Sequence, residues 1–142
     1  MNHKLVPHEQ YSLIQLFEPA FDTSITVEFE ELSRDLFRQS TRNIIVDLSQ
    51  TRAIDVAGIS VLKKINMLCS RELGILVLVS DDDDFLDILM DARIRDVVIL
   101  NTVEEAIDAV FMNDLENEFT AESDDFEDDE FDPEGFIPEK AE

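Results

Sequence analysis

The sequence predicts a single α/β domain with a small mixed sheet, followed by an acidic C-terminal tail. Short apolar runs alternate with amphipathic segments of helical period along residues 10–112, which is the pattern of strands that alternate with helices. The run at 75–79 is apolar throughout, as is typical of a strand buried on both faces of a sheet with parallel neighbours. Over residues 113–142 the periodicity ends and acidic residues dominate, which indicates a disordered tail.

The first half of the domain is predicted to contain a strand, a helix and a second strand. Residues 11–17 alternate loosely between apolar and polar side chains, which favours a strand. The segment Asp22–Ser24 can cap a helix over about 25–39, where apolar residues recur at steps of three and four. The next apolar run predicts a strand at 44–48. Residues 1–9 are expected to form either a flexible N-terminus or a short first strand.

The second half continues the alternation. A helix that begins near Gly58 is predicted to end at Gly74, where a left-handed C-terminal cap is expected. The acidic residues 81–84 favour the start of a further helix through the helix dipole. The last strand is predicted at 97–100. The sequence Thr-Val-Glu-Glu that follows it is a capping box, which opens a helix to about Met112.

Charge and composition exclude several classes of function. The net charge is −23, and residues 113–142 contribute −13 of it through fourteen acidic residues and one lysine. Because contacts with phosphates require a basic surface, direct binding of nucleic acid is not expected, whereas a basic protein partner or plain solubility is. The single cysteine, Cys69, permits no intrachain disulfide and agrees with a reducing cytoplasm. The sequence shows no signal peptide and no apolar run near the ~20 residues of a membrane span, so we expect a cytoplasmic protein without membrane insertion.

The sequence contains no motif for catalysis or for metal binding. No cluster of cysteine and histidine has metal-ligand spacing, no glycine-rich phosphate-binding motif occurs, and no nucleophile–base pair can be assembled. The acidic run at 81–84 is expected to serve a helix start and not a cation, and Cys69 is expected to pack in the core. The sequence therefore predicts a non-enzymatic protein with no cofactor and no metal.

The most specific segment is residues 43–62, NIIVDLSQTRAIDVAGISVL. A strand and a polar connector lead to the tight turn Asp55–Gly58, which opens a helix. A loop between a strand and a helix lies at an exposed edge of an α/β domain, where binding sites usually form. The segment resembles the signature of STAS domains, the family of sulphate-transporter C-terminal domains and anti-sigma factor antagonists. In that signature a strand that ends in Asp-Leu-Ser precedes Ile-Asp-Ser-Ser/Thr-Gly. The resemblance covers about residues 10–112 and implies a STAS fold, with helices packed against a small sheet.

The resemblance also implies a docking surface at this turn. In phospho-regulated members an anti-sigma kinase phosphorylates the serine of the loop, and the added charge breaks the complex. That serine falls on Val56 and the following Ser/Thr on Ala57, so phosphorylation at the usual site is not expected. Asp55 matches the aspartate of the motif, which caps the helix or receives a donor from a partner, and Gly58 matches its glycine, which allows close packing. The expected partner-binding residues are Asp55, Val56, Ala57, Gly58, Ile59, Ser60 and Lys63, with Ser60 as the weak alternative phosphate acceptor.

The function that the resemblance implies is an anti-sigma factor antagonist-like interaction module in signal transduction and regulation of transcription. Its partner would be an anti-sigma factor or a GHKL-type kinase, unless the altered loop leaves the domain with a scaffolding role. The alternative is a cytoplasmic accessory subunit of a membrane ABC complex for lipid transport, because some such members carry Asp-Thr-Ala-Gly in the loop and Ala57-Gly58 matches that form. Homodimer formation is also left open. The tail is either a solubilising segment or a linear element whose phenylalanines bind a basic groove.

Overall fold

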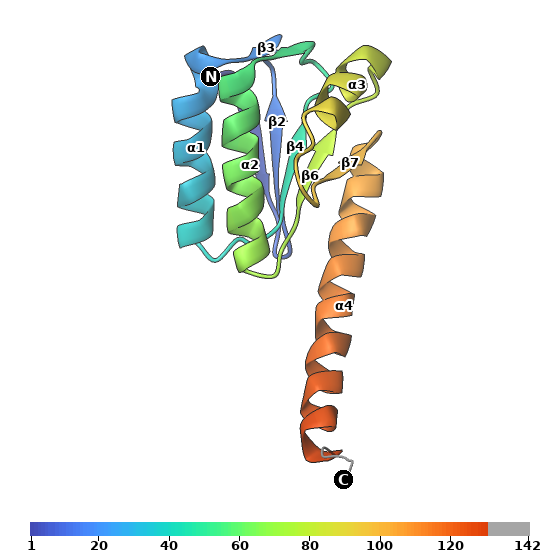
Figure 1. Cartoon of the computed structure of the whole chain (residues 1–142). Coiled ribbons are helices and arrows are strands. Elements are labelled where there is room, and N and C mark those ends of the chain that lie inside the picture. The colour runs from blue at the N-terminus through green and yellow to red at the C-terminus, as the bar shows by residue number, and fades with distance from the viewer. Residues whose placement is uncertain (131–142) are drawn as a thin grey trace. The chain divides into compact units, whose positions relative to one another are not determined.

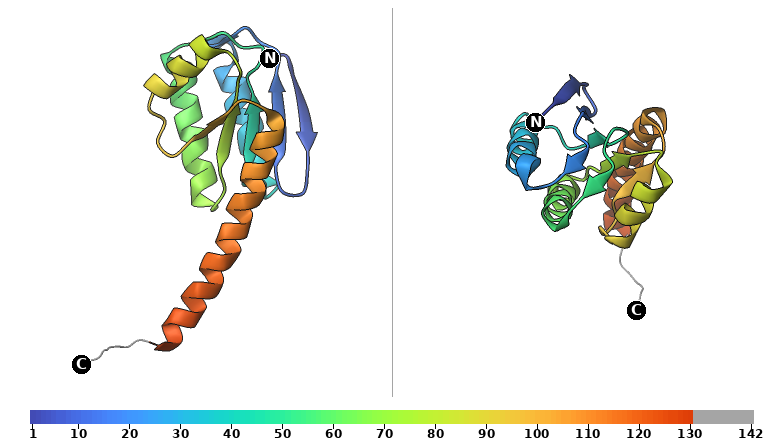
Figure 2. Two further views of the ribbon diagram at one scale, coloured as in Figure 1. Left: turned by 90° about the vertical axis from the view of Figure 1, so that its right-hand side faces the viewer. Right: turned by 90° about the horizontal axis from the view of Figure 1, so that it is seen from above.

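The fold is a five-stranded sheet with helices on both faces (Figures 1 and 2). The computed structural model describes residues 1–130, with side chains as far as Phe119. The elements are β1 (His3–Pro7), β2 (Ser12–Leu16), β3 (Ala20–Phe21), α1 (Thr23–Arg38), β4 (Ile44–Asp47), β5 (Ala53–Ile54), α2 (Val56–Arg71), β6 (Leu76–Val79), α3 (Asp83–Asp91), β7 (Val98–Leu100) and α4 (Val103–Glu130). The chain divides into a first unit, Met1–Phe111, and a second unit that begins at Met112. The predicted α/β class with a mixed sheet is confirmed.

The order of strands in the main sheet is β1-β2-β4-β6-β7. β1 runs antiparallel to β2, whereas the other neighbours are parallel. Parallel neighbours need a long crossover connection, which explains why a helix separates each of these pairs along the chain. Of the two expectations for residues 1–9, the structure has the short first strand.

Alternate side chains of the strands form two apolar cores, one on each face of the sheet. Ile44 and Val46 of β4 belong to the core that packs under α1, α2 and α3. Ile45 lies between them in sequence and belongs to the opposite core, which Ala106 and Val110 from the first turns of α4 cover. Because both faces of the central strands are buried, these strands are apolar at successive positions.

The structure contains a second, two-stranded sheet that no pattern in the sequence predicts. β3 pairs in parallel with β5, with Ala20 opposite Ala53 and Phe21 opposite Ile54. Strands of two residues are too short to show an alternation of apolar and polar side chains, so only the tertiary contact reveals them. Because β3 precedes α1 and β5 precedes α2, this sheet ties the N-terminal ends of the two helices together.

The predicted helix starts have the expected side-chain caps. Asp22 Oδ1 accepts a hydrogen bond from the Ser24 backbone N–H at 3.0 Å at the start of α1. At the start of α4, the Glu105 backbone N–H donates to Thr102 Oγ1 at 3.1 Å. These bonds satisfy backbone donors that have no partner inside a helix, and they explain why the cap residues predict the boundaries well.

The predicted left-handed cap at Gly74 is wrong. The left-handed residue at the end of α2 is Leu73, with φ of 64°. Gly74 is needed for space, because a Cβ added to it would lie 1.9 Å from the Arg42 carbonyl oxygen. The chain therefore accepts strain at Leu73 and keeps glycine where two backbone segments touch.

The predicted end of the last helix at Met112 is also wrong. α4 continues to Glu130, so residues 113–130 of the expected tail are helical, and the expectation for 131–142 lies outside the described residues. No proline or glycine occurs within α4, and glutamate is a good helix former. The helix therefore continues past the point where the apolar periodicity ends. No helix among the described residues is both long and apolar enough to cross a membrane.

Candidate partner-binding site

The expected docking residues lie at the N-terminal end of α2, directly after β5. Asp55 is the N-cap of α2, and its Oδ1 accepts a hydrogen bond from the Gly58 backbone N–H at 2.9 Å. The Asp55 backbone N–H donates to the Phe21 carbonyl of β3 at 3.3 Å. Asp55 thus has the capping role expected of it, and the β3–β5 sheet supports the turn. The residue is exposed, so a partner can also reach it.

Gly58 lies where the backbone of α2 is close to β3. A Cβ added to Gly58 would lie 2.4 Å from the Phe21 carbonyl oxygen and 2.7 Å from Ile54 Cγ1. Because one of these atoms belongs to the backbone, a side chain at this position would push α2 away from the small sheet. Gly58 is buried, so it shapes the turn and offers no side chain to a partner.

The solvent-facing side of α2 carries the remaining expected residues. Val56, Ser60 and Lys63 are exposed, and their steps of four and three residues place them on one face of the helix. Ala57 and Ile59 are half-buried beside them. Val56 is 80 % exposed, so its apolar side chain has almost no contact with its own domain. We call the seven expected residues at this end of α2 the docking surface.

A groove next to the docking surface gives no signal in the sequence. Met67 lies one helical turn beyond Lys63 and is 50 % exposed. The groove has a volume of about 410 Å³ and is lined by Lys63, Asn66, Met67, Ser70, Arg93, Ile94, Arg95 and Asp96. Asn66 Nδ2 donates to the Arg95 carbonyl at 2.6 Å and so holds the turn after α3 against α2. This contact joins residues far apart in sequence, which is why no local pattern predicts it.

Cys69 and Asp82, whose side chains could react or bind a cation, both have structural roles in the fold. Cys69 is buried in the core, and burial raises the pKa of its thiol to about 12, so little reactive thiolate is present at neutral pH. Asp82 caps α3, where its Oδ2 accepts from the Phe85 backbone N–H at 3.1 Å. Among the residues that the structure describes, no group of three or more His, Cys, Asp or Glu side chains could hold a metal ion.

Proteins of known structure share this fold. An anti-sigma factor antagonist from Mycobacterium paratuberculosis is 16 % identical, with a TM-score of 0.65 over 77 % of this chain and 92 % of that protein. The Bacillus cell fate determinant SpoIIAA in its phosphorylated form is 17 % identical, with a TM-score of 0.61 over 77 % of this chain and 99 % of its own. A sulfate transporter family protein from Wolinella succinogenes is 15 % identical, with a TM-score of 0.62 over 78 % and 91 % of the two chains. At these identities the likeness establishes the fold.

A comparison with models of protein families assigns the chain to a family as well as to a fold. No curated protein sequence matches this chain significantly. The STAS domain family model matches residues 8–106, which is more than half of the 142 residues. The matched range holds β2 to β7, the helices α1 to α3 and the whole docking surface. The resemblance seen in residues 43–62 is thereby confirmed, and the chain belongs to the STAS domain family.

Proposed function

We propose that this protein is a non-enzymatic interaction module, similar to anti-sigma factor antagonists, that binds a regulatory protein through its docking surface. The observation that supports this most directly is the exposure of Val56, an apolar side chain that is 80 % accessible at the first position of α2. It occupies the place where phospho-regulated members of the family carry their serine. The partner is an anti-sigma factor or a GHKL-type kinase in the cytoplasm, and the readout is regulation of transcription.

The chemistry of the docking surface indicates what the partner presents. Val56 and Ile59 supply apolar contact, while Lys63 lies beside the exposed Arg93 and Arg95 of the groove. An apolar patch with acidic groups at its rim is the complementary surface. The net charge of the whole chain, −23, favours a basic partner. The positive charge of Lys63, Arg93 and Arg95 nevertheless favours acidic groups on the part of the partner that contacts these residues.

The interaction is proposed to lack the phosphate switch at its usual position. Val56 has no hydroxyl, and Oδ1 of the preceding Asp55 already accepts from the Gly58 backbone N–H. Ser60 is exposed one turn further along α2, and a serine within a helix is usually plain surface. The complex therefore forms whether or not a kinase is active.

Incubation of the full chain with its cognate kinase and ATP is expected to leave the intact mass unchanged. The physical reason is the absence of a hydroxyl at Val56. The Ser60→Ala variant serves as the control, because it removes the alternative acceptor. A stoichiometric gain of one phosphoryl group that disappears in Ser60→Ala would contradict the unswitched interaction.

A second function has a specific observation in its favour. The Wolinella succinogenes protein of similar fold is a sulfate transporter family protein, and Ala57-Gly58 matches the loop of STAS members that serve lipid-transport ABC complexes. The second candidate is thus a cytoplasmic accessory subunit of such a complex.

Affinity purification of the full chain from its native cells distinguishes the two functions. We expect a soluble anti-sigma factor or kinase to co-purify, because the docking surface is small and suits one protein contact. Capture in detergent of a permease together with its ATPase, with no soluble kinase, would favour the transport function. A Val56→Asp bait is the control in both cases, since it should lose the partner that binds the docking surface.

A further inference from the structure

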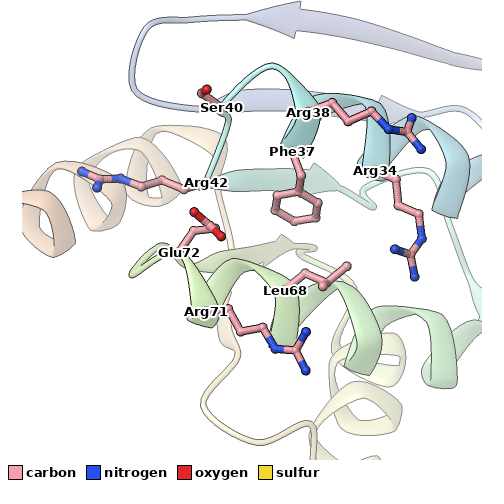
Figure 3. Close-up of a pocket in the computed structure, with 8 residues that line it drawn as sticks. All are labelled: Arg34, Phe37, Arg38, Ser40, Arg42, Leu68, Arg71 and Glu72. Atoms are coloured by element: carbon pink, nitrogen blue, oxygen red, sulfur yellow. The ribbon is translucent and has the colours of Figure 1, made fainter.

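A second cavity lies between the C-terminal ends of α1 and α2 (Figure 3). Its volume is about 570 Å³, and its lining includes Arg34, Arg38, Arg42 and Arg71. Four of the eleven basic residues in a chain of net charge −23 therefore line one cavity. Such a concentration of one charge, opposite in sign to the rest of the molecule, attracts anions to this place. We call this cavity the basic pocket.

The basic pocket is separate from the docking surface. Val56 and Arg71 are the first and last residues of α2, which has 16 residues. At 1.5 Å per residue they are about 22 Å apart along the helix axis. A change in one site can therefore be made without touching the other.

Helix dipoles explain only part of the arginine cluster. Arg38 and Arg71 lie in the last turns of α1 and α2, where a cation is favourable next to the C-terminal carbonyls. Arg34 lies a turn earlier and pairs with Glu30, with Nε 2.9 Å from Oε2. Arg42 lies beyond the helix. Two of the four arginines therefore have no helix end to stabilise.

The ion pairs of these arginines leave guanidinium N–H donors available to a ligand. Arg38 forms an ion pair with Asp35. Arg71 makes no ion pair or side-chain hydrogen bond with any residue in the described part of the chain. A guanidinium has five N–H donors in a fork that matches carboxylate or phosphate, so at least Arg71 can take an anionic group from outside.

The floor of the basic pocket is apolar. Figure 3 shows Phe37 and Leu68 between the arginines of α1 and α2, and both side chains are half-buried. A simple anion would leave these groups in contact with water. A ligand that places an apolar group on Phe37 and Leu68 and an anionic group on each flanking arginine satisfies both parts of the pocket.

Carboxylates fit this pocket better than a compact phosphate. Phosphate sites commonly use helix N-termini, whereas both helices here present their C-terminal ends, which carry partial negative charge. Glu72 adds a carboxylate to the lining. Separate carboxylates on flexible side chains can each reach one guanidinium and stay away from Glu72, which a dense polyanion cannot do.

We propose that the basic pocket binds an acidic peptide segment of a partner protein, with an aromatic or aliphatic side chain on Phe37 and Leu68 and carboxylates on Arg34 and Arg71. The domain then has two independent contact sites, one at each end of α2. Because most of the remaining chain is acidic and repels such a peptide, its binding requires a local basic site of this kind.

The test is binding of a fluorescein-labelled twelve-residue peptide, in which glutamates flank two phenylalanines, to the full chain by fluorescence anisotropy. We expect saturable, salt-sensitive binding that the double variant Arg34→Gln/Arg71→Gln weakens by about tenfold or more, since each lost contact involves charged hydrogen bonds. A peptide with alanine in place of phenylalanine should bind several-fold more weakly than the parent peptide, because it leaves the apolar floor uncovered.

The matched control is Arg93→Gln/Arg95→Gln, which removes the same charge from the groove beside the docking surface. Binding should stay within about twofold of the unmodified chain, because neither Arg93 nor Arg95 lines the basic pocket. Circular dichroism melting checks that the pocket variant is folded. If it is not, Arg71→Gln alone serves, because that exposed side chain has no partner among the described residues.

Three results would overturn the proposal. The first is unchanged peptide binding by the folded pocket variant. The second is loss of binding in the groove variant alone, which would move the peptide to the groove lined by Arg93 and Arg95. The third is binding of pyrophosphate with no binding of the peptide, which would assign the basic pocket to a small phosphorylated molecule. The proposed partner at the docking surface is tested separately, by Val56→Asp.

Discussion

Replacing Val56 with aspartate is expected to weaken binding of the proposed regulatory partner by about 1–3 kcal/mol, the usual cost of leaving a polar or charged group unpaired in an interface. Val56 is 80 % exposed, so the new carboxylate disturbs no contact within the domain. In a complex it would be covered by the partner. Isothermal titration calorimetry of the co-purified partner with Val56→Asp and with the unmodified chain measures the difference.

The fold itself should tolerate this change. An acidic residue at the first position of a helix interacts favourably with the helix dipole, so the midpoint of urea unfolding should not fall. Leu73→Asp is the matched control, since it adds the same charge to another exposed apolar position. Leu73 lies just beyond the far end of α2, and the helix is about 22 Å long from Val56 to Arg71. Aspartate also tolerates the left-handed backbone found at Leu73. Equal affinities for Val56→Asp and Leu73→Asp would remove the docking surface from the interface.

Replacing Gly74 with alanine is expected to lower the free energy of unfolding by about 2–3 kcal/mol, at the upper end of the range for overpacked sites. The added Cβ would lie 1.9 Å from the Arg42 carbonyl oxygen and 2.5 Å from its carbonyl carbon. Both atoms belong to the backbone segment that leads into β4, so a side-chain rotation cannot relieve the clash. Either that segment or the end of α2 has to move.

Urea denaturation followed by far-UV circular dichroism measures this loss. Ser70→Ala is the control, because Ser70 is an exposed residue of α2 and a surface substitution usually changes stability by less than about 0.5 kcal/mol. If Gly74→Ala unfolded at the same urea concentration as Ser70→Ala, the close approach between Gly74 and Arg42 would not limit stability.

Local signals in the sequence predict most of the element pattern. The caps at Asp22 and Thr102 and the apolar run of β4 predict their elements because each signal depends on neighbours within a few residues. The end of α4 is not predicted, because a helix without breakers can continue in a polar sequence once its apolar face has ended. The left-handed residue at the end of α2 is Leu73 and not the expected Gly74. Glycine is needed at position 74 because a side chain there would clash with the Arg42 carbonyl.

The candidate site is predicted in part. The motif locates the turn at Asp55 and Gly58, and it shows that Val56 brings no hydroxyl to it. It cannot show that β3 pairs with β5 behind the turn, because that contact joins segments about 33 residues apart. It also cannot show the groove at Arg93 and Arg95, which depends on how the turn after α3 packs on α2.

The sequence by itself determined the α/β alternation, the STAS motif and the loss of the usual phosphate acceptor, because period, caps and side-chain chemistry are properties of short segments. Only the tertiary structure decided which surfaces exist. Two strands, β4 and β5, and most of α2 separate Arg34 from Arg71 along the chain. The two arginines nevertheless line one pocket, because α1 and α2 pack side by side on the same face of the sheet (Figure 1). A charge pattern along the sequence cannot show this convergence, since it arises from contacts between distant residues.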